Sequence, residues 1–258
     1  MLHYQTYELN PSADWVTFIH GAGGSSSIWF KQIRDFKQHF NVLLVDLRGH
    51  GKSKDHLYNK LKRYNFQIIG DEVIEVLRHL NIAKTHFVGI SLGTVIVREI
   101  SDRYPELTQS MIMGGAVMQL NLKSQILMKM GNALKSILPY LFLYKLLAFV
   151  TMPKKNHRES RILFVNEAKK LYQKEFIRWF ALASTISPLL KLFRIHDSGI
   201  PTLYIMGAED HMFLHSITKL VKNHNSSQLY VVPECGHVVN VEQPEIFNTQ
   251  SIKFLQGL

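Results

Sequence analysis

A serine between two glycines is the first feature of this sequence that could do covalent chemistry. Ser91 stands in Gly89-Ile90-Ser91-Leu92-Gly93, after an apolar run and before a helical pattern. At a strand-to-helix turn this arrangement can hold a serine nucleophile in a strained backbone conformation, because the flanking glycines have no Cβ to collide with their neighbours. The same turn directs the backbone amide of Leu92 toward the reacting centre. We therefore predict that Ser91 is a nucleophile.

A serine hydroxyl needs a base, and the base needs a group that orients it. His237 follows an apolar run near the end of the chain and is the predicted base. Asp210 follows the preceding apolar run and is the predicted group that holds the imidazole. Two other carboxylates compete for this role, Glu209 beside Asp210 and Asp197 on the preceding loop.

Two other glycine-rich stretches imitate nucleotide-binding loops but are incomplete. Gly21-Ala22-Gly23 begins a G-x-G-x-x-G pattern, yet Ser26 stands where its third glycine is required. The stretch "GHGKS" ends like a P-loop, but Asp46 stands five residues before Gly51, where a P-loop needs glycine. We therefore expect no nucleotide cofactor. No cluster of His, Cys and carboxylates predicts a metal site.

The positive charge of the chain is concentrated in one block. The net charge is +10, and residues 121–196 contain 14 Lys or Arg against 3 Glu, whereas the remainder has 16 basic and 17 acidic residues. A nucleic-acid partner would have to bind this block alone, and we expect none. Lysines recur there among apolar residues, at Lys123, Lys129, Lys135 and Lys145. Basic amphipathic helices bind anionic membrane surfaces, so we expect either that contact or a solvated outer face.

Short apolar runs alternate with helical patterns over the rest of the chain. This alternation predicts an α/β fold with a mostly parallel sheet, because strands buried on both faces are apolar throughout. The predicted strands are His3–Glu8, Val16–Ile19, Val42–Val45, Thr85–Val88, Ser110–Met113, Thr202–Met206 and Gln228–Val232. The predicted helices are Ser27–His39, Asn65–Leu80, Thr94–Tyr104, Ser216–Asn223 and Pro244–Gln256.

Residues 119–196 break this alternation. They are helical in pattern and rich in Leu, Met, Phe and Lys, so we predict a helical insertion, the cap, on a core of residues 1–118 and 197–258. Within it, Ser136–Pro153 is near the lower length limit of a membrane span. Lys145 near its middle would cost about 2.5–3.5 kcal/mol on insertion scales. We expect amphipathic helices over a cavity instead.

Other reactive residue types have structural explanations. His20 is expected to brace the glycine-rich loop, and Asp46 and Arg48 are expected to form a pair that stabilises a turn. Cys235 is the single cysteine, so no intrachain disulfide can form, and burial explains it better than chemistry. The N-terminus has no basic region followed by an apolar run. Together these features favour a reducing, cytoplasmic compartment.

The motifs together resemble the α/β-hydrolase family over nearly the whole chain. The resemblance rests on "HGAGGSSSIW", "VDLRGHGKS", "GISLG", "GAEDHM" and "CGHVVNVEQPEIF", which occur in the family's order. It is strengthened by the chain order Ser91, Asp210, His237. The resemblance implies that the amide of Ala22 joins that of Leu92 in an oxyanion hole, with Gly23 as the alternative to Ala22. It also implies that residues 119–196 are the family's lid.

The resemblance further implies a serine hydrolase that needs no cofactor. We expect it to cleave small-molecule carboxylic esters with an apolar acyl group through an acyl-enzyme. Carbon–carbon bond hydrolysis of an anionic diketone-like metabolite is the main alternative, and thioester or lactone hydrolysis remains open. Family members that hydrolyse epoxides or remove halogens carry Asp where this chain has Ser91. A ligand-binding receptor on the same scaffold is the alternative of another class.

Overall fold

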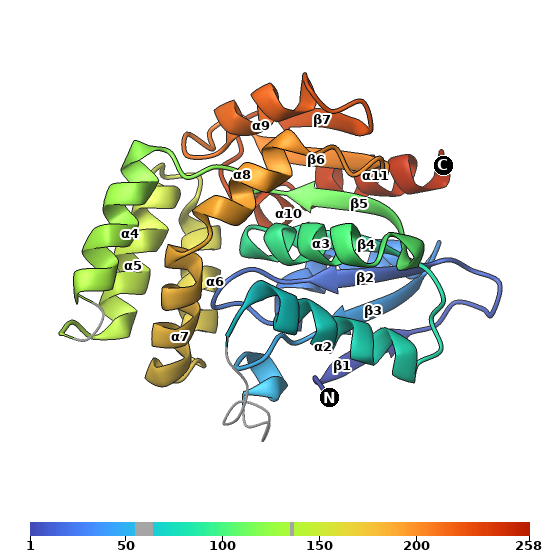
Figure 1. Cartoon of the computed structure of the whole chain (residues 1–258), viewed down its shortest axis with the longest axis horizontal. Helices are drawn as coiled ribbons and strands as arrows, with labels where there is room; N and C mark the ends of the chain where they lie inside the picture. Colours follow the sequence, from blue (N-terminus) through green and yellow to red (C-terminus); the bar gives the residue numbers. More distant parts are fainter. Residues whose placement is uncertain (55–63, 135–136) are drawn as a thin grey trace.

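The described residues form a seven-stranded sheet at the centre of the molecule (Figure 1). The computed structural model describes residues 1–54, 64–134 and 137–258, without the side chains of residues 122, 123 and 134. The strand order is β1-β3-β2-β4-β5-β6-β7, and only β1 runs antiparallel to its neighbour within this described sheet. The strands are β1 (Tyr4–Tyr7), β2 (Trp15–Ile19), β3 (Asn41–Val45), β4 (Thr85–Ile90), β5 (Thr108–Gly114), β6 (Thr202–Gly207) and β7 (Ser227–Val232).

Helices cover both faces of the sheet, which explains why the inner strands are mostly apolar. One face packs against α2 (Phe66–His79), α3 (Leu92–Arg103) and α9 (Leu214–Val221). The other packs against α1 (Phe30–Phe36), α10 (Val239–Glu242) and α11 (Pro244–Gln256). Successive residues of β4 divide between the two layers, with Phe87 in the first and Val88 in the second. Short 3-10 turns complete the core at Ser26–Trp29, Gly51–Ser53 and Pro105–Leu107.

The predicted α/β class and mostly parallel sheet are confirmed, and each predicted strand overlaps an observed one. The helix predicted over Ser27–His39 is wrong in its first turn. Ser26–Trp29 is a 3-10 turn, and α1 begins only at Phe30. The reason is local, because the Ser25 hydroxyl accepts the amide hydrogen of Ser27 and caps the tighter turn.

In the described part of the insertion between β5 and β6, the chain forms five helices. They are α4 (Leu122–Leu134), α5 (Tyr140–Thr151), α6 (Arg158–Ala168), α7 (Gln173–Ser184) and α8 (Ser187–Ile195). They lie beyond the carboxyl ends of the parallel strands (Figure 1). Leu143 and Tyr144 of α5, Ala168 of α6 and Phe176 of α7 make a small core of their own. The cap is therefore a packed layer over the edge of the sheet where Ser91 lies.

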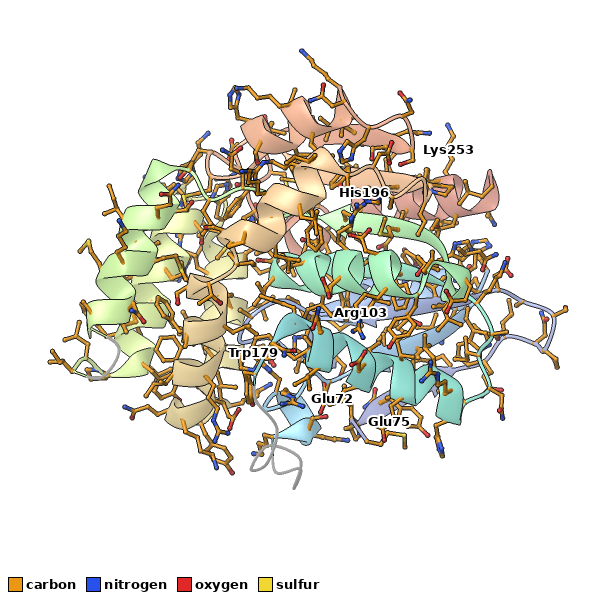
Figure 2. All side chains as sticks on the ribbon, viewed as in Figure 1. Glu72, Glu75, Arg103, Trp179, His196 and Lys253 are labelled. Carbon is orange, nitrogen blue, oxygen red and sulfur yellow. The ribbon has the colours of Figure 1, made fainter. Side chains whose placement is uncertain are left out.

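Hydrogen bonds to backbone carbonyls help to fix the cap to the core. Arg194 at the end of α8 donates to the carbonyl of Met118, at 2.7 Å, which joins the two ends of the insertion. Trp179 of α7 donates its indole N–H to the carbonyl of Arg48, at 3.1 Å, and Figure 2 shows it where α7 meets the core. Arg98 of α3 donates to the carbonyl of His196, at 2.7 Å.

The membrane-span interpretation of residues 136–153 is not supported. The described part of this stretch forms α5, which has 12 residues. In the part of the chain that the structure describes, no single helix has the length and hydropathy to cross a bilayer. A bent pair, α7 with α8, meets the length and composition test, with a 47° bend between the two.

Candidate active site

Ser91 occupies a sharp turn between β4 and α3. Its backbone has φ 52° and ψ −124°, a conformation that side-chain-bearing residues seldom adopt. Gly89 and Gly93 make the turn sterically feasible. A Cβ on Gly89 would lie 3.0 Å from the backbone of Gly93, and one on Gly93 would lie 2.7 Å from the carbonyl oxygen of His20. The turn therefore strains Ser91 and presents its side chain beyond the sheet.

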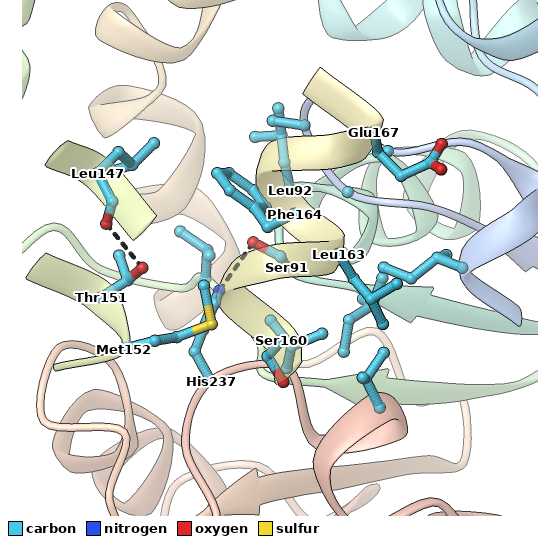
Figure 3. A pocket seen from close by; sticks show the side chains of 18 of the residues that line it. Ser91, Leu92, Leu147, Thr151, Met152, Ser160, Leu163, Phe164, Glu167 and His237 are labelled. Atoms are coloured by element: carbon cyan, nitrogen blue, oxygen red, sulfur yellow. Dashed lines mark hydrogen bonds between the residues drawn. The ribbon is translucent and has the colours of Figure 1, made fainter. Parts of the chain in front are cut away.

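Ser91, His237 and Asp210 form a continuous hydrogen-bonded chain. His237 Nε2 lies 2.8 Å from Ser91 Oγ, a contact drawn in Figure 3, and His237 Nδ1 lies 2.8 Å from Asp210 Oδ2. A carboxylate can only accept, so Nδ1 must donate and Nε2 is left to accept from the serine hydroxyl. The amides of Met212 and Phe213 donate to the other oxygen of Asp210, at 3.3 and 3.1 Å. This carboxylate is thus fixed on both sides and buried.

Glu209 and Asp197, the two alternatives to Asp210, make contacts with residues other than His237. Glu209 accepts from Lys154 at 2.8 Å and from Asn156 at 3.0 Å. These hydrogen bonds hold the pKa of Glu209 at about 2, below its ordinary value. Asp197 accepts from the backbone amides of Gly199, at 3.1 Å, and Ser226, at 3.2 Å. Of the three carboxylates weighed in the sequence, Asp210 is the one that meets His237.

Two buried histidines brace the glycine-rich loop. The amide of Leu47 donates to His20 Nε2, and the amide of Gly23 donates to His50 Nε2, both at 3.0 Å. The Nδ1 of each ring lies within hydrogen-bonding distance of a backbone carbonyl. Because Nε2 accepts in both rings, each imidazole is neutral. The amide of Gly23, the alternative to that of Ala22 in the predicted oxyanion hole, is occupied by His50, and Ala22 lines the same cavity as Ser91.

Burial lowers the pKa of His20, and it lowers that of His50 to about 3 with a contribution from His20. The unfolded chain takes up protons below about pH 6.5, whereas His50 in the folded chain resists protonation down to about pH 3. The stability contribution is therefore complete above pH 6.5 and is lost as the pH falls toward 3. We expect His50→Gln, which keeps a donor and an acceptor, to reduce this acid-induced loss by about 1.4 kcal/mol per pH unit.

Urea unfolding at pH 7.5, 6.5 and 5.5 measures this effect. His79→Gln is the matched control, because His79 lies exposed in the last turn of α2. The control should keep the pH dependence of the native chain. An unchanged slope in His50→Gln would refute the account of His50 as a neutral brace.

A cavity of about 480 Å³ lies above Ser91. Its wall is mostly apolar and combines core residues with residues of the cap, as the close view in Figure 3 shows. The core contributes Ile90, Leu92, Val117 and Phe213, and the cap contributes Leu147, Met152, Leu163 and Phe164. The wall also includes two charged residues, Glu167 and Lys170; Glu167 contacts Lys170 and accepts from Ser25 at 2.7 Å.

One cap residue near the site was missed by the sequence analysis. His157 is fully buried, and its Nε2 lies 2.8 Å from Glu209 and 3.8 Å from Glu242. Glu209 adjoins Asp210, and Glu242 accepts from the amide of Gly236, beside His237, at 2.6 Å. His157 therefore connects the start of α6 to the loop that carries Asp210 and to the loop that carries His237. No recognisable motif surrounds His157, so nothing in the sequence distinguishes it from the other histidines, of which the chain has thirteen in all.

The expected pairing of Asp46 with Arg48 is wrong. Asp46 instead accepts from the amides of Ser26, at 2.7 Å, and Lys52, at 2.9 Å. Arg48 is buried against Glu72 on α2, with its Nε 2.7 Å from the carboxylate. Asp46 thus stabilises the turn by accepting backbone hydrogen bonds. The guanidinium of Arg48, two residues later, instead pairs with Glu72 and holds α2 against the core.

The described residues include no group of three or more His, Cys, Asp or Glu that could hold a metal ion. Cys235 is buried, and burial raises the pKa of its thiol. The thiolate that cysteine chemistry requires is therefore disfavoured here.

Known proteins resemble this chain in sequence and in structure. Residues 14–244 match the model of a family described as alpha/beta hydrolase fold. The proposed carbamate hydrolase RutD of Agrobacterium fabrum is 24% identical over 268 residues, covering 98% of both chains. A hydrolase from Oleispira antarctica has a TM-score of 0.86 at 17% identity, over 100% of this chain and 95% of its own. The enol-lactonase of Burkholderia xenovorans has a TM-score of 0.79 at 17% identity, over 99% and 96%.

Proposed function

The chain belongs to the α/β-hydrolase fold family and is a hydrolase, and from that premise we propose that it cleaves carboxylic esters with an apolar acyl group. One observation carries the proposal. Ser91, His237 and Asp210 are joined by two hydrogen bonds of 2.8 Å at the floor of a cavity with a mostly apolar wall. A nucleophile, a base and an orienting carboxylate in this order are the parts that acyl transfer requires.

In the proposed mechanism, His237 Nε2 takes the proton of Ser91 as the hydroxyl attacks the ester carbonyl. Asp210 holds the ring in the tautomer that can accept this proton and stabilises the imidazolium that forms. The amides of Ala22 and Leu92 donate to the tetrahedral oxyanion. His237 then protonates the departing alcohol, and an acyl-enzyme remains on Ser91. Water that gives its proton to His237 releases the acid and restores the serine.

The cavity wall supports an ester with an apolar acyl group over the main alternative. Hydrolysis of a carbon–carbon bond in an anionic diketone-like metabolite would use the same three side chains. Such an anion calls for uncompensated positive charge on the wall. Lys170 is the one Lys or Arg among the described lining residues, and Glu167 contacts it. Thioesters and lactones need the same nucleophile, base and oxyanion donors as esters. Measured rates of hydrolysis distinguish the three substrate classes.

An ester panel tests the proposal. We expect kcat/KM to rise roughly fourfold for each methylene added to the acyl chain, until the cavity is filled, because each buried methylene contributes about 0.8 kcal/mol. Thioesters, lactones and diketones of matched size should be poorer substrates. A ligand-binding receptor would bind these compounds without turnover, so negligible hydrolysis across the panel would refute the enzyme assignment for this site.

A pair of variants links chain length to the cavity. Leu163 lies on its wall (Figure 3), whereas its neighbour Ile162 is exposed. Leu163→Trp should shorten the preferred acyl chain while hydrolysis of a short ester continues. Ile162→Trp should keep the native preference. An unchanged chain-length profile in Leu163→Trp would exclude this cavity as the acyl site.

We also propose a cytoplasmic enzyme with peripheral membrane contact and no nucleic-acid partner. A single buried cysteine supports a reducing compartment. The excess of 14 Lys or Arg over 3 Glu in residues 121–196 supports attraction to an anionic surface.

A further inference from the structure

Helix α5 presents an apolar face to solvent. Phe142 and Phe149 are 54% and 60% exposed, and Leu146 between them is also exposed. Lys145 is exposed beside them. The spacing of these four residues is i, i+3, i+4 and i+7, which places them on one side of the helix. The opposite side, with Leu143, Tyr144 and Ala148, is buried in the cap.

Helix α4 repeats this pattern. Ile126 and Met130 are exposed, with Lys129 between them, at the i, i+3, i+4 spacing. Both helices lie at the left edge of Figure 1, away from the sheet. Of the other lysines noted in the sequence, Lys135 and the side chain of Lys123 lie outside the described residues. We call the exposed residues of the two helices the α4–α5 face: Ile126, Lys129, Met130, Phe142, Lys145, Leu146 and Phe149.

The charge of this surface is of one sign. No Asp or Glu occurs in the sequence from residue 107 to residue 158, a stretch that includes both helices. Single exposed apolar residues are ordinary on protein surfaces, but a group of them marks an interaction site. Phenylalanine, leucine and isoleucine beside lysine are the residues that enter the headgroup region of an anionic bilayer. A second copy of the chain fits poorly, because a two-fold contact would place the lysines of both faces against each other.

We propose that the α4–α5 face binds anionic lipid membranes and that the cavity receives its substrate from the bilayer. The same helices line the cavity with other residues, Met128 of α4 and Leu147 of α5. A membrane-bound cap therefore places the acyl cavity beside the lipid phase, where long-chain esters reside. The delivery of substrate rests on the proposed ester hydrolysis, whereas the binding of the face to lipid does not.

Co-sedimentation with vesicles tests the binding. The native chain should bind vesicles of phosphatidylcholine with phosphatidylserine, and bind little to phosphatidylcholine alone, and high NaCl should weaken the binding. We expect Lys129→Glu with Lys145→Glu to lower the partition coefficient at least about tenfold. Phe142→Gln with Phe149→Gln should lower it by a similar factor through the lost apolar contact. Neither pair lines the cavity, so hydrolysis of a soluble short ester should remain native.

The matched control is Val231→Gln with Lys219→Glu, an exposed apolar residue and an exposed lysine on the core. It should bind vesicles as the native chain does. Equal loss in the control and in the face variants would overturn the assignment of this face, as would native binding in both face variants. Absence of vesicle binding at low salt, in a preparation that hydrolyses the soluble ester, would overturn the membrane proposal and leave the hydrolase standing. Vesicle binding by a folded preparation that does not hydrolyse the soluble ester would overturn the proposed ester hydrolysis and leave the membrane binding of the α4–α5 face standing.

Discussion

Replacement of Ser91 by alanine will lower kcat/KM for a soluble ester by about 10⁴–10⁶-fold. The Ser91 hydroxyl is the group that His237 Nε2 contacts at 2.8 Å, and its removal leaves the base without a nucleophile to deprotonate. Alanine keeps the Cβ and so the same strained backbone at φ 52°. The midpoint of urea unfolding should therefore stay close to the native value, which separates loss of chemistry from loss of fold.

A fluorophosphonate probe checks the same assignment by covalent labelling. One label should form per chain, and peptide mass spectrometry should place it on Ser91. Ser160→Ala is the matched control, because Ser160 also lines the cavity but its buried hydroxyl has no hydrogen-bond partner among the described residues. This control should be labelled at the native rate. A label on any serine other than Ser91 would refute the nucleophile.

Asp210→Asn is expected to lower kcat by up to about 10⁴-fold. The amides of Met212 and Phe213 keep one side-chain oxygen of residue 210 as an acceptor, so the new amide nitrogen must face His237. That nitrogen donates to Nδ1 and forces the proton onto Nε2, where it blocks acceptance from Ser91. The loss should appear in kcat at an unchanged unfolding midpoint.

Two conservative variants serve as controls for this prediction. Glu209→Gln removes the charge beside Asp210, yet Glu209 contacts Lys154, Asn156 and His157. Asp197→Asn changes a carboxylate that caps a loop before β6. Both should retain activity within about tenfold of native, since neither contacts the imidazole of His237. Native activity in Asp210→Asn, together with loss in either control, would move the acid to the control residue.

The core of this fold could be read from the sequence because its signals are local. Strands buried on both faces are mostly apolar, so the sequence predicts a strand at Thr85–Val88, and β4 is observed at Thr85–Ile90. The glycines around Ser91 likewise indicate a tight turn, because a Cβ at either position would clash with the neighbouring backbone. The positions of Asp210 and His237 after successive strands placed them at one edge of a parallel sheet. The two 2.8 Å contacts follow from that topology.

The contacts of the cap could not be read in this way, because they depend on packing between segments far apart in the chain. Trp179 meets the carbonyl of Arg48, 131 residues earlier. His157 meets Glu209 across 52 residues. The 3-10 turn before α1 was missed for a different reason, since a helical apolar pattern does not report which side-chain oxygen caps the first turn. Pairing of Arg48 with Glu72 rather than Asp46 was likewise decided by the packing of α2.

The burial of His157 between Glu209 and Glu242 makes the cap and the catalytic loops one cooperative unit. A rigid-body swing of α6 away from the core would strip Glu209 of its imidazole partner and disturb the peptide of Gly236, next to the base. Opening of the cap and correct placement of Asp210 and His237 are then linked equilibria. The fraction of molecules with both residues correctly placed depends on the position of α6. Helix α5 belongs to the same unit, because Ala148 packs against Val238, next to His237, and because α5 shares a small core with α6 and α7. Movement of the cap is therefore expected to displace its helices together.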